Sequence, residues 1–570
     1  MAPKRKFTPP YIALYAFITF LAIGWCRLAY LQIIDHDHLA LLSKFNFMRL
    51  IKITPPRGNI VDTNGKLLAT NKPLCTVCWQ GTNNNNLSNQ QLLVIQKLAK
   101  ICKTPITDVL LKNIKHAERY QQQLIIAKDI TFEQLSCIVE QLSYTTNIAI
   151  RTDLQRYYPY QTLASHAIGH LSTQEIATTG KMGLEKICQN ELQGQVGFKK
   201  QTVNAKGYAI NEEPFKTYIT GKTLHTTINL AIQQIAEKAF PTDEVGALIV
   251  MDPTTGALRA LISRPSFNPE IFLRRLSQEQ WNTLQETQFF INRTCQACYP
   301  PASLFKLVSI AAAVEHSIVS HDAIRFCPGY YMFHDRPYHC NRQSGHGLIN
   351  IKQSLAQSCN IIFFEIGKKI SIDTLADYAH HFGLGLPTGA LFPEKVGLIP
   401  SSAWKRAYKG ERWYQGETLS VAVGQSFLLV TPIQIARMLG GIACGYLVKP
   451  RILEEETIEK QPLEIQESTR TFLKKCMKAA IKHGTGRAVR NIPNLKIYGK
   501  TGTAQVTSLE KKNTNKESQP HAWFVANFVY KEESPLTIVI LVEHAGGSRK
   551  PTMIAKQFLS NYQKYKNNHG

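Results

Sequence analysis

The first apolar feature of the chain is the run from Phe7 to Cys26, which contains no charged residue. Three basic residues, Lys4 to Lys6, precede it. An α-helix needs about 20 such residues to cross a bilayer, and basic residues favour the cytoplasmic side. The pattern predicts a cytoplasmic tail at residues 1–6 and one membrane-spanning helix at residues 7–33. A cleavable signal peptide is less well supported, because no small-residue cleavage site follows the run.

Short alternating and periodic segments follow the apolar run. Residues 51–69 read as strands that are separated by two prolines and closed by the turn Asn64-Gly65. Leu92 to Leu142 shows interrupted helical periodicity, which predicts a small helical lobe. No catalytic constellation falls within residues 34–221, so we expect a non-catalytic region there.

From residue 222 to residue 570, the pattern places strands around a helical centre. The predicted strands are two within residues 245–264 and one each in residues 495–506, 522–530 and 536–543. The predicted helices are residues 304–315, 351–357, 361–367 and 431–443. Because no strand–helix–strand alternation is visible, the pattern indicates an α+β fold and not a parallel sheet.

Length and charge narrow the classes of protein that the chain can belong to. With 570 residues, two or three domains are expected. The net charge of +25 suits an anionic partner, such as phospholipid head groups or an acidic polymer, and it suits a basic solubilising surface equally well. Nucleic acid is a poor candidate, because the basic residues are scattered and no helix-turn-helix, zinc-finger or RNA-binding signature is present.

The candidate chemistry begins with Ser303 and Lys306, which follow Pro300-Pro301 and precede an apolar stretch. Proline suits a helix start, so we expect a helix that begins near Ala302 or Ser303 and carries the serine and the lysine on one face. A neutral lysine at this spacing can take the proton of the serine hydroxyl. Alone, the pair is weak evidence for this chemistry, and a capping serine with a surface lysine is the better interpretation of it.

Two later motifs change this interpretation. Ser358-Cys359-Asn360 and Lys500-Thr501-Gly502-Thr503 follow in order. The set Ser-x-x-Lys, Ser-x-Asn, Lys-Thr-Gly is typical of penicillin-recognising serine acyltransferases. A phosphate-binding loop at Lys500 is excluded, because that motif needs a glycine where Asn494 stands.

With these motifs the chain resembles the class B penicillin-binding proteins, and most of all the elongation-specific penicillin-binding protein 2 type. Further matches are Arg57-Gly58, Asp62, Arg156-Tyr157-Tyr158-Pro159, Gly183-Leu184-Glu185, Gly424-Gln425-Ser426 and His521-Ala522-Trp523-Phe524. The sequence departs from the family at Ala302 and Ser426, where glycine is usual. The resemblance implies an elongated, mostly β pedestal or dimerisation domain at residues 34–221. It also implies a transpeptidase domain at residues 222–570, built as an antiparallel sheet with helices on both faces.

The resemblance also assigns roles to residues. It implies that Ser303 is the nucleophile, that Lys306 is its base, and that Ser358 relays a proton to the leaving amine. Asn360 then holds the substrate amide or Lys306. The remaining assignments are that Lys500 and Thr501 bind the substrate carboxylate, that Gly502 permits close approach, and that the amides of Ser303 and Thr503 hold the oxyanion.

As an expectation, the resemblance implies a peptidoglycan D,D-transpeptidase of the bacterial inner membrane, with its catalytic domain in the periplasm. Its partners would be peptidoglycan stem peptides, β-lactam antibiotics, a glycosyltransferase of the SEDS family and other membrane proteins of the elongation complex. No cofactor is required for this chemistry. The alternatives are a septal class B enzyme, a hydrolase, and a penicillin sensor or inactive scaffold that regulates a partner glycosyltransferase.

Four residues near the second motif suggest a metal. Cys327, Cys340, His346 and Cys359 form a complete tetrahedral zinc set that leaves no position for water, so the sequence predicts a structural zinc. The resemblance supports this hypothesis, since elongation-type relatives carry a metal-binding cluster in this interval. The alternatives are a Cys327–Cys340 disulfide, three unrelated thiols, or a replacement ligand from His334, Asp335 or His339.

Three other chemically capable sites are interpreted as structural. Cys75/Cys78 and Cys295/Cys298 lack a thioredoxin-like setting, so they are expected to be structural thiols or local disulfides. His166 has no partner at a catalytic spacing, so we expect it to be a structural histidine.

Overall fold

The structure, a computed structural model, describes residues 9–142, 145, 147–174, 177–204, 209–274, 276–505 and 516–569. It divides into two compact units, which are described separately. The first unit contains residues 1–57, 71–155 and 193–221, and the second contains residues 58–70, 156–192 and 222–570. The predicted domain boundary at 221/222 stays a prediction, because segments on both sides of it belong to the second unit.

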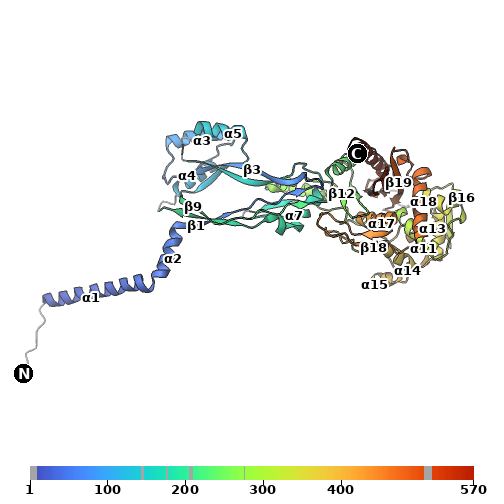
Figure 1. The fold of residues 1–570 in the computed structure, drawn as a ribbon, viewed down its shortest axis with the longest axis horizontal. Helices are drawn as coiled ribbons and strands as arrows, with labels where there is room; N and C mark the ends of the chain where they lie inside the picture. The colour runs from blue at the N-terminus through green and yellow to red at the C-terminus, as the bar shows by residue number, and fades with distance from the viewer. Residues whose placement is uncertain are drawn as a thin grey trace, which may run out of the picture. The chain divides into compact units, whose positions relative to one another are not determined.

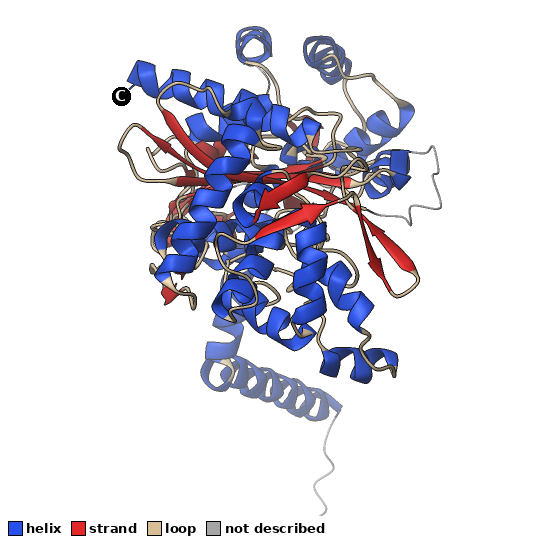
Figure 2. Ribbon diagram, turned by 90° about the vertical axis from the view of Figure 1, so that its right-hand side faces the viewer, coloured by secondary structure: helices blue, strands red, loops and turns tan. Residues whose placement is uncertain are grey.

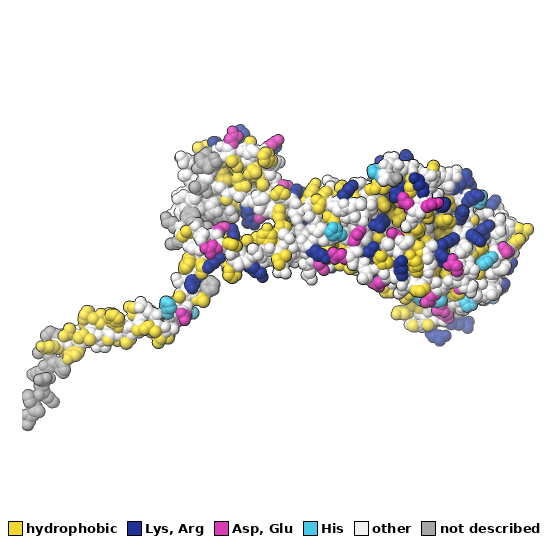
Figure 3. All heavy atoms as spheres, in the orientation of Figure 1, with side chains coloured by type: hydrophobic (Ala, Val, Ile, Leu, Met, Phe, Trp, Pro, Cys, Tyr) yellow, Lys and Arg dark blue, Asp and Glu magenta, His cyan; other side chains and the backbone are white. Residues whose placement is uncertain are grey.

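The first unit starts with an apolar helix, α1 (Pro9–Ala29), which continues through the π-helical turn Tyr30–Ile34 into α2 (His36–Phe47). Residues 11–34 have a mean hydropathy of 1.8, and none of them is buried. Figure 3 shows hydrophobic side chains along the visible face of α1. This is the one helix among the described residues that is long and apolar enough to cross a membrane. The predicted tail, residues 1–6, lies outside the described residues.

An antiparallel sheet follows, with the strand order β1-β8-β9. Its strands are β1 (Met48–Ile53), β8 (Gly197–Val203) and β9 (Ala209–Lys216). Opposite charges pair diagonally across it, as in the 2.7 Å ion pair of Lys199 with Glu212, which stands opposite Gln201. Such cross-strand pairs stabilise a half-exposed sheet.

The predicted helical lobe is present and packs on strands (Figure 1). Its helices are α3 (Asn89–Cys102), α4 (Asp108–Arg119) and α5 (Phe132–Leu142), and Ser88 and Thr107 cap the first two. Their apolar faces bury Val77 and Trp79 of β3 (Leu67–Gln80). The sequence pattern missed β4 (Gln123–Ala127), which lies between α4 and α5 in the sequence and pairs with β3. The strand β5 (Ile148–Tyr157) also pairs with β3.

The motifs outside the catalytic region have structural explanations in the second unit. β2 (Ile60–Val61) pairs with β3 as predicted, and Gly65 in the turn has a φ of +78°. Asp62 accepts hydrogen bonds from the amides of Asn64, Lys66 and Leu230. The buried guanidinium of Arg156 forms a 2.7 Å ion pair with Glu185 and donates to the carbonyl of Gly58. These side chains therefore hold distant segments together.

The largest element of the second unit is an antiparallel sheet with the strand order β12-β11-β21-β20-β19. Its strands are β11 (Gly246–Met251), β12 (Leu258–Arg264), β19 (Leu495–Ala504), β20 (His521–Tyr530) and β21 (Leu536–Val542). Alternate side chains enter two different cores. Along β11, Ile249 and Met251 pack into one core, and Leu248 and Val250 into the other. The sheet is therefore buried on both faces.

Helices cover both faces of this sheet (Figure 2), which confirms the predicted α+β fold. The core that contains Leu248 and Val250 is completed by α9 (Leu230–Ala239) and α19 (Arg549–His569). The core that contains Ile249 and Met251 is completed by α11 (Lys306–Glu315), α12 (Ile351–Ala356), α13 (Ile361–Lys369), α17 (Pro432–Cys444) and α18 (Glu467–His483). The sequence pattern missed several helices, among them α10 (Gln278–Glu286), α14 (Ile372–His381), α15 (Ser402–Lys409), α16 (Gln415–Ala422), α18 and α19.

Short elements complete the second unit. They are α6 (Ser165–Ile168), α7 (Gly183–Ile187), α8 (Gln189–Gln193), β6 (Leu171–Gln174), β7 (Ala177–Gly180), β10 (Leu224–His225), β13 (Ile324–Cys327), β14 (Tyr330–Phe333), β15 (Arg336–His339), β16 (Gly347–Asn350), β17 (Tyr446–Val448) and β18 (Lys460–Pro462). The antiparallel pair β13–β16 and the hairpin β14–β15 that its connection contains lie in the sequence between Ser303 and Ser358.

Candidate active site

Ser303 lies in a 3₁₀ turn, Ala302–Leu304, directly before α11. The sequence predicted a helix start near Ala302 or Ser303, but the α-helix itself begins at Lys306. A 3₁₀ turn is common at a helix N-terminus and still places residues three apart on one side. Ser303 is half-buried, and Lys306 is fully buried at 0% exposure.

The segment before Ser303 is fixed on both sides. Tyr299 exchanges backbone hydrogen bonds with Val430, and the amide of Ala302 donates to the carbonyl of Gly424 at 2.9 Å. From the sheet, the indole of Trp523 donates to the carbonyl of Pro300 at 3.0 Å. The position of the Ser303 hydroxyl therefore depends on three segments that are distant in sequence.

Both departures from the family pattern occupy a backbone conformation that favours glycine. Ala302 has a φ of +49° and Ser426 a φ of +71°. Residues with a Cβ atom adopt this region at a cost of about 1–2 kcal/mol. The strain at Ala302 lies one residue before Ser303, so it is stored at the candidate nucleophile.

The first two motifs meet through their side chains. The Ser358 hydroxyl donates to the Ser303 hydroxyl at 2.7 Å, and Lys306 Nζ lies 3.3 Å from Ser358 Oγ. Within the described residues, Ser358 thus forms a hydrogen-bonded link between Ser303 and Lys306. The sequence reading assigned Ser358 to the leaving group and did not foresee this link.

Lys306 makes three further contacts. Its ammonium donates to the carboxamide of Asn360 at 2.8 Å and to the carbonyls of Ser358 and Cys359 at 2.9 and 3.1 Å. Burial lowers the pKa of Lys306 to about 8, because the charged amine is removed from water. A substantial neutral fraction near pH 8 is what a base toward a serine hydroxyl needs.

The third motif lies at the edge of the sheet. Lys500 is fully buried on β19, where its ammonium donates to the carbonyl of Thr501 at 2.8 Å. Burial, with a contribution from the charge of Lys306, holds the pKa of Lys500 well below its usual value. Two buried amines close to one another leave a strong preference for an anion at this place.

The residues that follow Lys500 on the edge strand β19 face the turn of Ser303 or the segment around Thr485. A Cβ atom on Gly502 would lie 3.3 Å from the carbonyl oxygen of Pro301, so glycine permits β19 to approach the Ser303 turn. Thr503 is exposed, and Thr501 contacts the hydroxyl of Thr485. Sequence reasoning missed Thr485, because it lies in an irregular connection without a recognisable motif.

The four predicted metal ligands converge. One ligand atom from each of Cys327, Cys340, His346 and Cys359 lies within 4.8 Å of the other three. Cys340 Sγ lies 3.8 Å from Cys359 Sγ, and Nδ1 of His346 lies 3.5 Å from the sulfur atoms of Cys327 and Cys340. A tetrahedral zinc with bonds of about 2.3 Å to sulfur and about 2.0 Å to nitrogen sets sulfurs about 3.8 Å apart and sulfur from nitrogen about 3.5 Å. The residues fit zinc.

The alternatives for these cysteines find no support in the geometry. All thirteen cysteines are free thiols, including Cys327, Cys340 and the pairs Cys75/Cys78 and Cys295/Cys298. His334, Asp335 and His339 do not belong to the cluster. The amide of Asn360 donates to Cys340 Sγ at 3.4 Å, so the cluster adjoins the Ser-x-Asn motif directly.

His166 is structural, as the sequence suggested. It is 4% exposed, its Nε2 lies 2.6 Å from the carbonyl oxygen of Phe289, and its ring packs edge-on against Phe267. Burial lowers its pKa to about 4.

Comparison with known families gives two matches along the chain. Residues 246–560 match the model of the penicillin binding protein transpeptidase domain, and residues 52–226 match that of the penicillin-binding protein dimerisation domain. The chain belongs to the penicillin-binding protein transpeptidase family. The range that matches the transpeptidase domain contains the three motifs that the fold brings together around Ser303.

Several similar proteins carry the name peptidoglycan D,D-transpeptidase MrdA. The chain is 28% identical to the peptidoglycan D,D-transpeptidase MrdA of Acinetobacter baumannii, across 93% of this chain and 84% of that protein. It is also 28% identical to the MrdA protein of Escherichia coli K12, across 88% of this chain and 85% of that one.

Solved structures show the same architecture. Penicillin-binding protein 2 of Helicobacter pylori, solved in complex with MreC, superposes with a TM-score of 0.78 at 27% identity, covering 92% of this chain and 99% of that one. A chain of a peptidoglycan synthase complex that coordinates polymerisation and crosslinking superposes with a TM-score of 0.77 at 25% identity, covering 98% of this chain and 99% of that one.

Proposed function

We propose that this penicillin-binding protein is a serine-type peptidoglycan D,D-transpeptidase, which crosslinks stem peptides during cell elongation and is acylated by β-lactams. The observation that carries the proposal is the hydrogen-bonded link from Ser303 through Ser358 to the buried Lys306, beside the Lys500–Thr503 edge of β19. Relatives named as D,D-transpeptidases support this reading, and they do not favour the septal or the sensor alternative.

The first half-reaction is acylation. Ser303 Oγ attacks the carbonyl carbon of the penultimate D-alanine, and its proton passes through Ser358 to the neutral amine of Lys306. The oxyanion is held by the amides of Ser303 and Thr503. The carbon–nitrogen bond then breaks, and the leaving amine of the terminal D-alanine receives the proton from Lys306 through Ser358. The carboxylate of that residue is bound by Lys500 and Thr501.

The second half-reaction transfers the acyl group. The amine of a neighbouring stem peptide attacks the ester carbonyl, its proton goes to the same Ser358–Lys306 pair, and Ser303 leaves with a proton restored. Asn360 orients the amine of Lys306 and the substrate amide, and Gly502 allows the acyl chain to lie close to β19. A β-lactam presents its ring carbonyl to Ser303 in the same way.

We assign the rest of the chain to the support of this chemistry. Residues 1–6 form a cytoplasmic tail, residues 7–33 an anchor in the inner membrane, residues 34–221 a pedestal and residues 222–570 a periplasmic catalytic domain. The solved complexes of relatives, one with MreC and one that couples polymerisation to crosslinking, suggest the partners: MreC-like proteins and a SEDS-family glycosyltransferase of the elongation complex.

We further infer that Cys327, Cys340, His346 and Cys359 hold a structural zinc. Four ligands leave no open position, so the metal stabilises the fold and takes part in no chemical step. It ties the β13–β16 region to the Ser358–Asn360 segment, which carries three of the acceptors around Lys306.

A fluorescent penicillin tests the proposed function. The wild-type chain labels covalently and keeps the label, Ser303→Ala does not label, and Lys306→Ala loses most of its acylation rate. A label that is shed within one turnover indicates a β-lactamase instead. Labelling of Ser303→Ala at the wild-type rate contradicts the proposal.

A further inference from the structure

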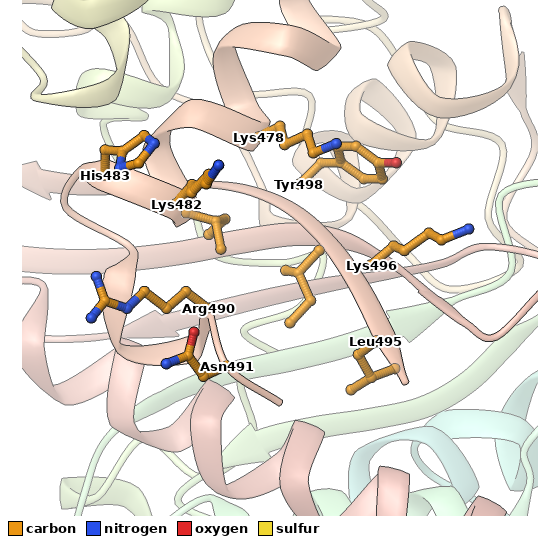
Figure 4. Close-up of a pocket in the computed structure, with 10 residues that line it drawn as sticks. Lys478, Lys482, His483, Arg490, Asn491, Leu495, Lys496 and Tyr498 are labelled. Carbon is orange, nitrogen blue, oxygen red and sulfur yellow. The ribbon is translucent and has the colours of Figure 1, made fainter. Parts of the chain in front are cut away.

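A groove of about 490 Å³ lies beside the catalytic edge strand, between α18 and β19 (Figure 4). We call it the basic groove. The cations that line it are Lys478 and Lys482 of α18, Arg490 of the segment that follows, and Lys496 of β19. All four side chains are exposed, and His483 joins them at the end of the helix.

The charge of the basic groove is not neutralised locally. Between Glu467 and Glu510 the sequence has no acidic residue and carries a lysine or arginine at positions 470, 474, 475, 478, 482, 487, 490, 496 and 500. Within the described part of the chain, no carboxylate lines the groove or pairs with its four cations. A concave surface with charge of one sign concentrates ions of the other sign. The basic groove therefore favours the binding of an anion.

The groove leads to the active site from two directions. Tyr498, which lines it, stands two positions before Lys500 on β19. At the other wall, His483 is followed at once by Gly484 and Thr485, and Thr485 contacts Thr501. Among the described strands β19 pairs with β20 alone, so it is the edge strand of the sheet. A chain bound in the groove can thus continue along this edge toward Ser303.

The lining is not uniformly ionic. The apolar side chains of Ile481, Leu495 and Ile497 share it with the cations, and Asn491 and Tyr498 add neutral hydrogen-bonding groups. A phosphate polymer presents anions at every repeat and little apolar surface. A stem peptide combines methyl side chains with free carboxylates, and this mixture matches the lining better.

We propose that the basic groove binds a peptidoglycan strand through the free carboxylates of its stem peptides and holds the strand beside the catalytic edge. This inference rests on the proposed function, and it adds to that function a binding surface outside the Ser303 site. None of Ser303, Lys306 and Lys500 lines the groove, so acylation by penicillin and binding of peptidoglycan are expected to depend on different residues.

The test measures sedimentation of the full-length chain in detergent with insoluble peptidoglycan, at low and high salt. The triple variant Lys478→Glu, Lys482→Glu, Lys496→Glu is expected to bind about tenfold more weakly or worse at low salt and to lose the salt dependence. The control is Lys238→Glu, Lys368→Glu, Lys369→Glu, three exposed lysines near the ends of α9 and α13. It has the same net charge and is expected to bind as the wild type does. Equal loss in the control overturns the proposal, and so does unchanged binding of the groove variant.

Chemical treatment of the peptidoglycan identifies the anion. Amidation of its carboxylates is expected to remove the difference between wild type and groove variant, whereas hydrofluoric acid, which strips phosphate polymers, leaves that difference intact. The opposite pattern assigns the groove to a phosphate polymer and overturns the proposal.

Penicillin labelling separates this test from that of the proposed function. Both triple variants are expected to label at the wild-type rate, which also shows that they are folded. If the groove variant does not label, the milder set Lys478→Gln, Lys482→Gln, Lys496→Gln replaces it in the same comparison. A wild-type chain that does not label contradicts the proposed transpeptidase function, but its binding to peptidoglycan can still be compared with that of the groove variant. Normal labelling of both, with unchanged binding of the groove variant, contradicts only the proposed peptidoglycan binding in the groove.

Discussion

The hydroxyl of Ser358 donates a 2.7 Å hydrogen bond to the hydroxyl of Ser303, across 55 positions of sequence. Lys306 lies on the far side of Ser358, with its Nζ 3.3 Å from the same oxygen. These hydrogen bonds run from Lys306 through Ser358 to Ser303. When Lys306 is neutral, rotation of the two hydroxyls reverses them, and a proton leaving Ser303 then has a route to the buried amine through Ser358. On the proposed mechanism, Ser358 therefore takes part in acylation as well as in departure of the leaving group.

Replacing Ser358 tests the proton route. Ser358→Ala removes the shared hydroxyl, so we expect the second-order rate constant for penicillin acylation to fall by about 10²- to 10⁴-fold, the usual contribution of a positioned proton-transfer group. Ser354→Ala is the matched control, because Ser354 is also buried but donates to the carbonyl of Asn350. Stopped-flow acylation kinetics measure both. A Ser358→Ala rate close to that of the wild type means that the proton moves from Ser303 to Lys306 directly.

A second prediction concerns the close approach of Gly424 to the segment before Ser303. A Cβ atom on Gly424 would lie 1.9 Å from the carbonyl oxygen of Ala302, and its φ is +81°. Gly424→Ala must therefore displace Ala302 and, with it, the nucleophile. We expect at least a tenfold loss of acylation rate and a loss of about 2 kcal/mol or more in the free energy of unfolding.

Gly410 provides the matched control for that substitution. Its φ of +68° is similar, but no atom lies within 4 Å of a Cβ atom built there. Gly410→Ala is expected to cost only about 1 kcal/mol of stability and to leave acylation unchanged. If the two variants lose acylation equally, backbone conformation and not contact with Ala302 explains the effect.

Much of the catalytic sheet was predictable, because its strands have direct signatures. Segments such as Leu536–Val542 are apolar runs bounded by turn residues, and the strand near Ile60 pairs through the Asn64-Gly65 turn as predicted. α18 and α19 were missed because most of their exposed positions carry lysine, arginine or other polar residues, so the apolar stripe is thin. β4 was missed because it is short and stands between helices.

The active site likewise contains residues that the sequence predicted and contacts that it could not predict. Ser303, Ser358 and Lys500 lie in motifs whose spacing is visible in the sequence. The link through Ser358 and the contact of Thr485 with Thr501 arise from tertiary packing, to which no local pattern corresponds. The 3₁₀ turn at Ser303 also depends on packing, since Gly424 and Trp523 fix the backbone before it from outside.

The metal cluster supports a prediction on both composition and stability. Purified chain is expected to contain one zinc, and removal of it by a chelator is expected to cost about 4 kcal/mol and to lower Tm by about 10 °C. Acylation then slows, because Asn360, which bonds to Lys306, also donates its amide to Cys340. Elemental analysis and thermal denaturation measure these effects.

Two variants control the zinc experiment. Cys340→Ser with His346→Ala removes two ligands and is expected to leave the chain without zinc. Cys444→Ser changes a half-buried cysteine outside the cluster and is expected to retain the full amount. Zinc that persists in the double variant, or a wild type without stoichiometric metal, rejects the structural zinc.

His166 gives the stability of the second unit a dependence on pH. Its pKa is lowered to about 4 in the folded chain, because burial disfavours the charged imidazole and Arg293 and Arg264 add to the effect. The unfolded chain has the ordinary value near 6.5, so between pH 6.5 and pH 4 the unfolded state binds the proton that the folded state excludes. Stability is therefore complete above about pH 6.5 and declines as the pH falls, by about 2 kcal/mol between pH 7.5 and pH 5.

His166→Gln keeps a donor for the carbonyl of Phe289 and removes the titration, so thermal denaturation at these two pH values should show a smaller difference for the variant. An equal decline in both proteins would assign the acid sensitivity to other groups.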